Sequence, residues 1–407
     1  MGNQKKPMRM PILHLPMEVI REILSWLPVK SVCRFRCVSK SWKSLILDPQ
    51  FVKLHSDKAL EHEDVFYQRR RVMIKDDSCH CLFSLDLDEV LDQNDIDNLG
   101  DNHDLLVKFR ALRSKDLSGD DYYHGDDDVD DNEDLYPRCC IFSRVVLCCE
   151  GMLLLLGLSR LFGNVCLLNP ATRESKVLPD PPEMFTPETG DYYYCVSGFA
   201  FDRCTQDYKV VKGDCCEGEL KFCVYSLRNN SWLVIERQHH YEGFQSGQEG
   251  KVLNGGIHWV VQRNFEPESS MVILCFLLSE EEVREIPLPT DFDIVNNEEV
   301  NLSVVGECLC MIPKYYEKHE AFWVMKKYRV RESWTQIRVC IPSLSWSHSG
   351  FWKNGYDLVL FKAEGKLVLL NSDEETFRNL SFDQIRIGYV GIYLESLFSP
   401  NFPAITD

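Results

Sequence analysis

The first fifty residues carry a helical pattern of apolar and polar positions. Leu15-Pro16 can open a helix, because proline is tolerated in a first turn, and Pro28 ends that helix near Leu27. The apolar positions in between fall on one face and the polar positions on the other, which predicts an amphipathic helix of about three turns. Its apolar face holds Val19, Ile20, Ile23, Leu24 and Leu27.

Two shorter helices are predicted next. One covers residues 30–36, with Val32 and Phe35 facing inward, and the other begins after Ser39, a suitable N-cap. After Phe51 the helical pattern fades. Three helices cannot close a core alone, because chains below about 40 residues usually need a metal, a disulfide or a partner. The pattern therefore indicates either a helical subdomain docked on the rest of the chain or one whose missing core belongs to another protein.

The remaining chain alternates short apolar runs with polar turns. Residues 65–91 predict a hairpin around the polar stretch 75–78, and from Tyr136 onward hairpins recur in pairs. Five equivalent turn entries are separated by 57, 52, 50 and 43 positions, namely Asn169, Ser226, Leu278, Tyr328 and Asn371. Periods near about 40–50 residues with four strands per unit are typical of propeller blades. We expect a mainly β fold with a small N-terminal α domain, in which residues 60–400 form a β-propeller of six blades; a pair of β-sandwiches would not explain this period.

Charge divides the chain unevenly. The formal net charge is −18, yet residues 1–60 carry an excess of +7, so that residues 61–407 carry −25. An acidic insertion, residues 92–135, includes ten acidic residues and no Lys or Arg between positions 116 and 134. Such a block repels itself and predicts a disordered loop. A chain of this charge does not favour nucleic-acid binding.

The composition indicates the cellular compartment and the kind of chemistry to expect. The eighteen cysteines lie mostly in apolar runs, without a C-x-x-C pair, which predicts reduced thiols in a cytoplasmic or nuclear protein rather than a metal site. No apolar run of membrane-spanning length and no secretory signal occurs. We identify no catalytic motif. His258 lies on an apolar strand, where a structural role is favoured. Most of four tryptophans are expected in the propeller core, namely Trp232, Trp259, Trp323 and Trp334. We expect no cofactor.

The N-terminal helices closely resemble the F-box. The resemblance rests on Leu15-Pro16-x-Glu18-Val19-Ile20-x-x-Ile23-Leu24, on Leu27-Pro28-Val29-Lys30-Ser31-Val32, and on Arg34-Phe35-Arg36-Cys37-Val38-Ser39-Lys40-Ser41-Trp42. It implies a three-helix module over 11–55, after a tail at 1–10, that docks on a Skp-type adaptor and through it on cullin and RING subunits of an SCF ubiquitin ligase. The adaptor-binding residues implied are Leu15, Pro16, Val19, Ile20, Ile23, Leu24, Leu27, Pro28 and Val32.

The later repeats look like the F-box-associated domain of plant F-box proteins, including the S-locus F-box group. The matching stretches include Asn169-Pro170-Ala171-Thr172-Arg173, Asp207-Tyr208-Lys209-Val210-Val211 and Asn254-Gly255-Gly256-Ile257-His258-Trp259. The resemblance implies a non-catalytic subunit that recruits an unknown target protein for ubiquitination. The alternative is a propeller-fold ligand-binding protein or enzyme with an incidental helical cap. Target recognition is expected in the loops 180–194, 238–250, 264–270 and 290–301, since propellers hide their strand edges.

Overall fold

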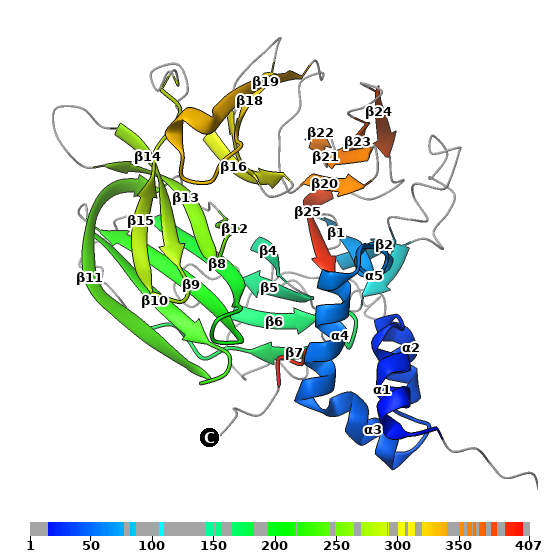
Figure 1. Ribbon diagram of the computed structural model, residues 1–407. Helices are drawn as coiled ribbons and strands as arrows, with labels where there is room; N and C mark the ends of the chain where they lie inside the picture. The colour runs from blue at the N-terminus through cyan, green and yellow to red at the C-terminus, as the bar shows by residue number, and fades with distance from the viewer. Residues whose placement is uncertain are drawn as a thin grey trace, which may run out of the picture. The chain divides into compact units, whose positions relative to one another are not determined.

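In the computed structural model the chain forms two compact units, a helical unit and a β unit (Figure 1). The boundary between them in the sequence falls after Arg69. The two units are described separately below. The structure describes residues 15–76, 82–86, 106–109, 144–149, 151–156, 165–182, 194–216, 219–244, 249–263, 270–290, 292, 300–305, 308–313, 320–339, 350–353, 356–359, 361–363, 366–371, 376–380 and 387–401.

The helical unit begins with the three predicted helices. They are α1 (Met17–Ser25), α2 (Val29–Phe35) and α3 (Lys40–Leu47). Pro16 and Pro28 occupy the N-cap positions of α1 and α2. The Ser39 hydroxyl accepts a hydrogen bond from the Trp42 backbone N–H at 3.1 Å, so the predicted N-cap of α3 is confirmed.

Two further helices complete this unit, namely α4 (Pro49–Glu61) and α5 (Glu63–Arg69). The prediction that the helical pattern fades after Phe51 is therefore wrong. Asp48 caps α4 by accepting from the Gln50 backbone N–H at 2.7 Å, with Pro49 in the first turn. The core of the three predicted helices is completed at least in part by this chain itself, because α4 and α5 bury apolar side chains in the same unit as α1–α3. The buried apolar residues are Leu24, Val29, Val32, Ile46, Phe51, Val52, Ala59 and Val65.

The β unit is built from short antiparallel strands. The described strands are β1 (Arg70–Asp76), β2 (Leu82–Asp86), β3 (Leu106–Phe109), β4 (Arg144–Cys149), β5 (Met152–Leu156), β6 (Val165–Asn169), β7 (Glu174–Val177), β8 (Tyr194–Asp202), β9 (Asp207–Cys216), β10 (Glu219–Ser226), β11 (Ser231–Phe244), β12 (Lys251–Leu253), β13 (Gly256–Arg263), β14 (Ser270–Leu277), β15 (Glu282–Ile286), β16 (Val300–Val305), β17 (Cys308–Pro313), β18 (Glu320–Met325), β19 (Trp334–Val339), β20 (Gly350–Lys353), β21 (Tyr356–Val359), β22 (Phe361–Ala363), β23 (Lys366–Asn371), β24 (Thr376–Leu380) and β25 (Ile387–Leu394).

The first sheet joins the two ends of the β unit. Its order is β25-β1-β2-β3, and the Ser84 hydroxyl lies 3.0 Å from the Tyr393 hydroxyl across a sequence separation of 309. The predicted hairpin over 65–91 is confirmed for β1 and β2, although Val65 belongs to α5. The acidic insertion is not a loop throughout, because β3 lies within it and pairs with β2; residues 110–135 lie outside the described residues.

The same turn recurs at the end of successive sheets. Four residues separate the paired ends Asn169 and Glu174, Ser226 and Ser231, and Leu277 and Glu282. The last residue of each turn is left-handed, with φ of 61° at Arg173, 51° at Asn230 and 54° at Glu281. Of the turn entries predicted from the sequence, Asn169, Ser226 and Asn371 are the last paired residues before a turn. Leu278 and Tyr328 lie one and three residues beyond the last paired residues, Leu277 and Met325.

Tryptophan side chains link neighbouring sheets in a repeated manner. The Trp232 indole N–H, at the start of β11, donates to the Pro179 carbonyl at 2.8 Å. The Trp334 indole N–H, at the start of β19, donates to the Pro287 carbonyl at 2.9 Å. Each acceptor follows the last strand of the preceding group of four, so the repeat extends to the contacts between sheets.

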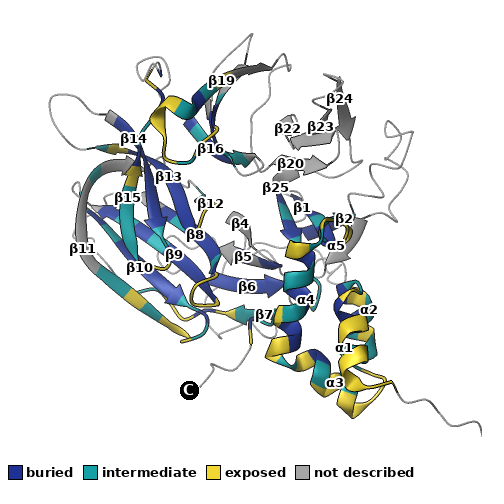
Figure 2. Cartoon of the chain, viewed as in Figure 1, coloured by how far each residue is buried: buried dark blue, intermediate teal, exposed yellow. Residues whose placement is uncertain are grey.

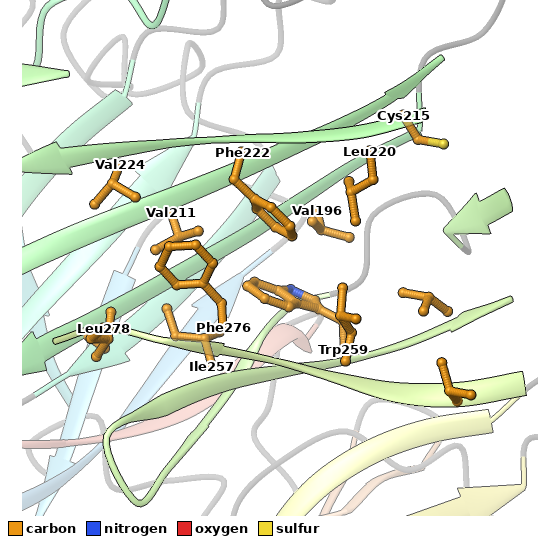
Figure 3. Packing of buried hydrophobic residues seen from close by; sticks show 14 residues of the cluster. Val196, Val211, Cys215, Leu220, Phe222, Val224, Ile257, Trp259, Phe276 and Leu278 are labelled. Atoms are coloured by element: carbon orange, nitrogen blue, oxygen red, sulfur yellow. The ribbon is translucent and has the colours of Figure 1, made fainter. Parts of the chain in front are cut away.

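Alternate residues of one strand pack against sheets on opposite sides. Ile257 and Trp259 of β13 pack with residues of β8–β10, whereas Val260 packs with residues of β16–β19. Figure 3 shows the first of these clusters, where Phe222, Trp259 and Phe276 point toward one another. Because successive side chains of a strand point to opposite faces, sheets buried on both faces stack side by side. This is the arrangement of a β-propeller.

The predicted number of six blades is not established by the sheets. Within the described ranges the strands form sheets of four, eight, six, three and four strands rather than six equal blades. The eight-stranded sheet arises because the C-terminal part of β11 also pairs with β13. The six-stranded sheet arises because β20 meets β16 through the single pair Val305 and Gly350. The fold is mainly β, with five N-terminal helices and a β-propeller.

Candidate functional site

An exposed stripe of apolar side chains lies along α1. Leu15, Val19 and Ile23 are 56%, 41% and 48% exposed, and we call these three residues the apolar stripe. Residues four apart share one face of a helix, and the Pro16 carbonyl accepts from the Val19 and Ile20 backbone N–H groups at 3.1 Å, which continues the helical geometry back to Pro16. Figure 2 shows α1 as largely exposed. A unit with a filled core that still exposes such a stripe presents a surface suited to burial by a partner.

The other predicted adaptor-binding residues lie at different depths. Pro16 is exposed, whereas Ile20, Leu27 and Pro28 are half-buried. Leu24 and Val32 lie in the interior, at 2% and 0% exposed. These two can support the surface from below rather than line it. The assignment of all nine residues to adaptor binding stays a prediction.

Trp26 extends the exposed surface beyond the predicted residues. It is 39% exposed, and its indole N–H donates to Glu22 Oε1 at 2.9 Å. The Lys58 ammonium lies 4.5 Å from the ring centroid, and the His62 ring centroid is also 4.5 Å away. Hydrogen bonds from Trp26 and Lys58 lower the pKa of Glu22. Trp26 stands three residues after Ile23 and seven after Val19, so helical spacing could have identified it.

A buried arginine holds the end of α1 from the inside. Arg69 is 0% exposed, and its Nη2 donates to the carbonyls of Ser25 at 2.7 Å and Leu27 at 3.0 Å. Its Nη1 donates to His55 Nδ1 at 3.0 Å and to the His55 carbonyl. Arginine has no acceptor, so Nδ1 accepts and the other ring nitrogen, Nε2, carries the proton that it donates to the Leu27 carbonyl at 3.0 Å. Arg69 and His55, the Arg69–His55 clamp, thus fix the corner between α1 and α2.

The clamp makes the helical unit sensitive to acid. Burial, and then the Arg69 charge, lowers the pKa of His55 to about 3 from its ordinary 6.5. Below about pH 6.5 the His55 ring is protonated in the unfolded chain but stays neutral in the folded unit. The stabilisation is therefore fully present above pH 6.5 and is lost as the pH falls toward 3. The loss is about 1.4 kcal/mol per pH unit in that window. Urea unfolding of the helices, followed by far-ultraviolet circular dichroism at several pH values, should show this slope in the wild-type chain and a flatter one in His55→Gln; equal slopes would contradict it.

The candidates in the β unit are only partly described. Three of the loops expected to bind a target, 180–194, 264–270 and 290–301, lie largely outside the described residues. The prediction of a loop over 238–250 is wrong for its first part, because residues 238–244 belong to β11, which pairs with β13 there. His258 has the structural role predicted for it, since it is 0% exposed, its Nδ1 donates to the Lys251 carbonyl at 2.9 Å and its Nε2 accepts from the Tyr328 hydroxyl at 2.7 Å. Trp259 and Trp334 are buried in the propeller core, as expected, and Trp232 and Trp323 are half-buried against it.

The described residues contain neither a candidate metal centre nor a helix that could span a membrane. No group of three or more His, Cys, Asp or Glu side chains among the described residues is placed to hold a metal ion. None of the helices in those same ranges is both long and apolar enough to cross a membrane. Five thiols in those ranges form no disulfide, namely Cys37, Cys166, Cys204, Cys275 and Cys308.

Known proteins match both units. The F-box domain family matches residues 12–54 and the F-box associated beta propeller domain family matches residues 129–393. F-box protein CPR1 of Arabidopsis thaliana is 25% identical, over 79% of this chain and 72% of its own length. F-box/kelch-repeat protein At3g23880 of the same plant is 25% identical over 95% and 96%. Among solved structures, TolB from Acinetobacter baumannii matches with a TM-score of 0.44 at 9% identity, over 84% of this chain and 72% of that one.

The two family matches define a class, that of F-box proteins, which in general are substrate-recognition adaptors of SCF-type ubiquitin ligases. Because the propeller family matches more than half of the sequence, the chain belongs to the F-box proteins that carry an F-box associated β-propeller domain. The resemblance noted in the sequence is confirmed at this level, and the alternative of an incidental helical cap is not favoured. Membership of the S-locus group stays a prediction.

Proposed function

We propose that this protein recruits a target protein to an SCF ubiquitin ligase, with the apolar stripe of α1 docked on a Skp-type adaptor that connects it to cullin and RING subunits. One observation supports this most strongly. The helical unit buries its own core and yet leaves Leu15, Val19 and Ile23 about half exposed. Full burial of such a side chain is worth about 1.5–3 kcal/mol, so burying the exposed half of each would contribute roughly half of that.

Charge around the stripe fits an acidic partner. Lys30 and Arg34 of α2 and Lys40 and Lys43 of α3 are all exposed, and the sequence up to residue 60 carries a net +7. Complementary charge at the rim of an interface raises association rates and suppresses wrong partners. Skp-type adaptors are acidic as a family, as the sequence resemblance implies. The basic rim and the apolar stripe together suit this partner.

The contribution to ubiquitination is positional. The chain itself supplies no reacting group; it holds a target close to a charged ubiquitin-conjugating enzyme. Tethering two molecules in one assembly replaces a bimolecular encounter by an intramolecular one with a high effective concentration. The cytoplasm or the nucleus is the proposed compartment.

Adaptor binding is tested with one charge placed in the stripe. We expect Ile23→Asp to weaken pull-down of a purified Skp-type adaptor at least about tenfold, because an unpaired carboxylate would be buried at the interface. Ile23 is 48% exposed, so the unit should stay folded. The matched control is Leu233→Asp, since Leu233 of β11 is 54% exposed in the other unit. Unchanged pull-down by Ile23→Asp, or equal loss in both variants, would overturn the proposal.

We propose further that the propeller has six blades. β21 and β22 are separated by a single position and can form one interrupted strand, which with β20, β23 and β24 makes a group of four. β21 also lies beside β23. The eight-stranded sheet then counts as two blades, β8–β11 and β12–β15, beside the groups β4–β7, β16–β19 and β25-β1-β2-β3. An experimental structure with fewer than six four-stranded groups would contradict this number.

A further inference from the structure

One hairpin turn of the propeller differs from its equivalents in length. The turns after β6, β10 and β14 each have four residues, but eight residues separate the paired Met325 and Trp334. The longer turn contains the short 3₁₀ helix η2 (Arg331–Ser333). We call residues 326–333, between β18 and β19 (Figure 1), the basic turn.

Four cations are concentrated in this turn. Lys326, Lys327, Arg329 and Arg331 are all exposed, beside the single acidic residue Glu332. None of the four forms an ion pair with another residue in the described part of the chain. Residues 61–407 carry a net charge of −25, so the basic turn is a positively charged segment in a negatively charged unit. The turn Leu278–Glu281, at the equivalent place after β14, holds two glutamates and no cation.

The basic turn is held in one shape by its own hydrogen bonds. The Ser333 hydroxyl donates to the carbonyls of Lys327 and Val330, both at 2.7 Å, and accepts from the Lys327 backbone N–H at 3.0 Å. The Lys326 backbone N–H donates to the Ser333 carbonyl at 3.2 Å. A surface that is already ordered loses less conformational entropy when a ligand binds.

The turn is also anchored to the neighbouring sheet. The Tyr328 hydroxyl donates to the buried Nε2 of His258 on β13 at 2.7 Å, and the two rings meet edge to face with centroids 5.7 Å apart. The Trp334 indole N–H adds the bond to the Pro287 carbonyl. The side chains of Tyr328 and Trp334 therefore point into the protein while the lysines and arginines face solvent.

From this geometry we infer that the basic turn docks an acidic segment of the target protein, one rich in glutamate or aspartate carboxylates. The inference deepens the proposed function, on which it rests, by naming the chemistry of the recognised segment. Carboxylates form charge-assisted hydrogen bonds with lysine and arginine. The acidic bulk of the unit repels such a segment only at short range, because the Debye length is about 8 Å at physiological ionic strength. The four cations of the turn thus decide the local potential.

A protein segment is favoured over a nucleic acid as the partner. A nucleic-acid surface needs basic side chains spread along the track of the phosphates, whereas the basic turn is a single small loop in a unit of net charge −25. A short acidic peptide matches its size.

The test uses the full-length chain and a fluorescent synthetic peptide of alternating glutamate and serine. Lys326→Glu/Lys327→Glu/Arg331→Glu reverses three exposed charges and spares Tyr328, Ser333 and the left-handed Arg329, whose φ is 64°. The control reverses three arginines in three other hairpin turns and changes the net charge equally, as Arg173→Glu/Arg203→Glu/Arg228→Glu; Arg173, which is left-handed, and Arg203 are exposed, and Arg228 is half-buried. We expect the first triple variant to weaken peptide binding at least about tenfold and the control less than about threefold. Binding to wild type should fall as salt is raised and vanish for the glutamine–serine peptide.

Three results would overturn the inference. In the first, the first triple variant binds the peptide as tightly as wild type. In the second, both triple variants lose the same amount of peptide binding. In the third, the wild type binds single-stranded DNA more tightly than the acidic peptide. Adaptor pull-down with the same variants separates this question from the proposed function. If the first triple variant keeps both adaptor and peptide, the basic turn is not the docking surface although the ligase role stands. If wild type fails to bind the adaptor, the ligase role itself fails.

Discussion

Replacing Arg69 by methionine should cost the helical unit about 3 kcal/mol or more and weaken adaptor binding along with it. The guanidinium donates to the carbonyls of Ser25, Leu27 and His55 and to the His55 ring. Hydrogen bonds to charged groups are worth about 1.5–3 kcal/mol, and a buried acceptor left unsatisfied costs about 1–3 kcal/mol. Methionine fills much of the volume but donates nothing. The corner after α1, which fixes Trp26 and the end of the apolar stripe, would lose its internal support.

The measurement is urea unfolding of the full chain, with loss of the helices followed by far-ultraviolet circular dichroism, together with adaptor pull-down. Lys53→Met is the matched control, because it removes an exposed cation that pairs with Asp57 at 3.0 Å and should change stability by less than about 1 kcal/mol. Equal stability of the Arg69 and Lys53 variants would show that the clamp contributes little. A destabilised unit that binds the adaptor with unchanged affinity below its unfolding transition would show that the clamp does not shape the docking surface.

The second large effect is expected in the propeller core, where Trp259→Ala should destabilise the β unit by about 3–5 kcal/mol. Trp259 is 0% exposed, its ring lies 5.9 Å from that of Phe222, and its indole N–H donates to the Ser197 carbonyl at 3.2 Å. The substitution leaves a cavity beside Phe222 and Phe276 (Figure 3). It also removes one of the two hydrogen bonds that the Ser197 carbonyl accepts, the other coming from the Gly250 backbone N–H at 2.8 Å.

Guanidinium unfolding of the β unit, followed by far-ultraviolet circular dichroism, measures the effect. Leu233→Ala, on a residue 54% exposed, should stay within about 0.5 kcal/mol of wild type. Trp259→Phe keeps most of the volume and should lose less than Trp259→Ala. A Trp259→Ala transition that coincides with wild type would mean that the two sheets do not depend on this contact.

Local signals in the sequence predicted much of the fold. Pro16, Pro28 and Ser39 mark the starts of three helices because a missing N–H and a side-chain cap act within one turn. The repeated turn entries predicted the hairpins, since a four-residue turn that ends in a left-handed residue imposes the same polar pattern each time. Such features depend only on neighbours in sequence.

The missed elements depend on contacts distant in sequence. The inner face of α4 includes His55 and Ser56, both buried, and these polar residues interrupt the apolar period by which a helix is identified. Arg69 was missed because arginine is almost never fully buried unless it is paired, and its partners lie 14 to 44 positions earlier. β3 was missed because it is only four residues long and its partners in β2 lie 21 to 27 positions earlier.

The sequence predicted which helices carry the candidate site, but not how deeply each of its residues is buried. Helical spacing placed Val19, Ile23 and Leu24 on one apolar face, and of these the structure exposes Val19 and Ile23. Leu15 came from the resemblance to the F-box. The same spacing could not separate surface from interior, so Leu24 and Val32 were assigned to a surface beneath which they lie. Only the packing of α4 and α5 decides which apolar residues of α1 and α2 remain for a partner.

The pairing of β25 with β1 sets an order of events during protein synthesis. β2 follows β1 closely in the sequence, but the other edge of β1 stays open until β25 emerges, because its partners in β25 lie 311 to 324 positions later. An open strand edge is a template for aggregation or chaperone binding. The described helical unit, in contrast, draws its contacts from residues 15–69. A nascent chain is therefore ready to bind an adaptor long before its propeller can close and select a target.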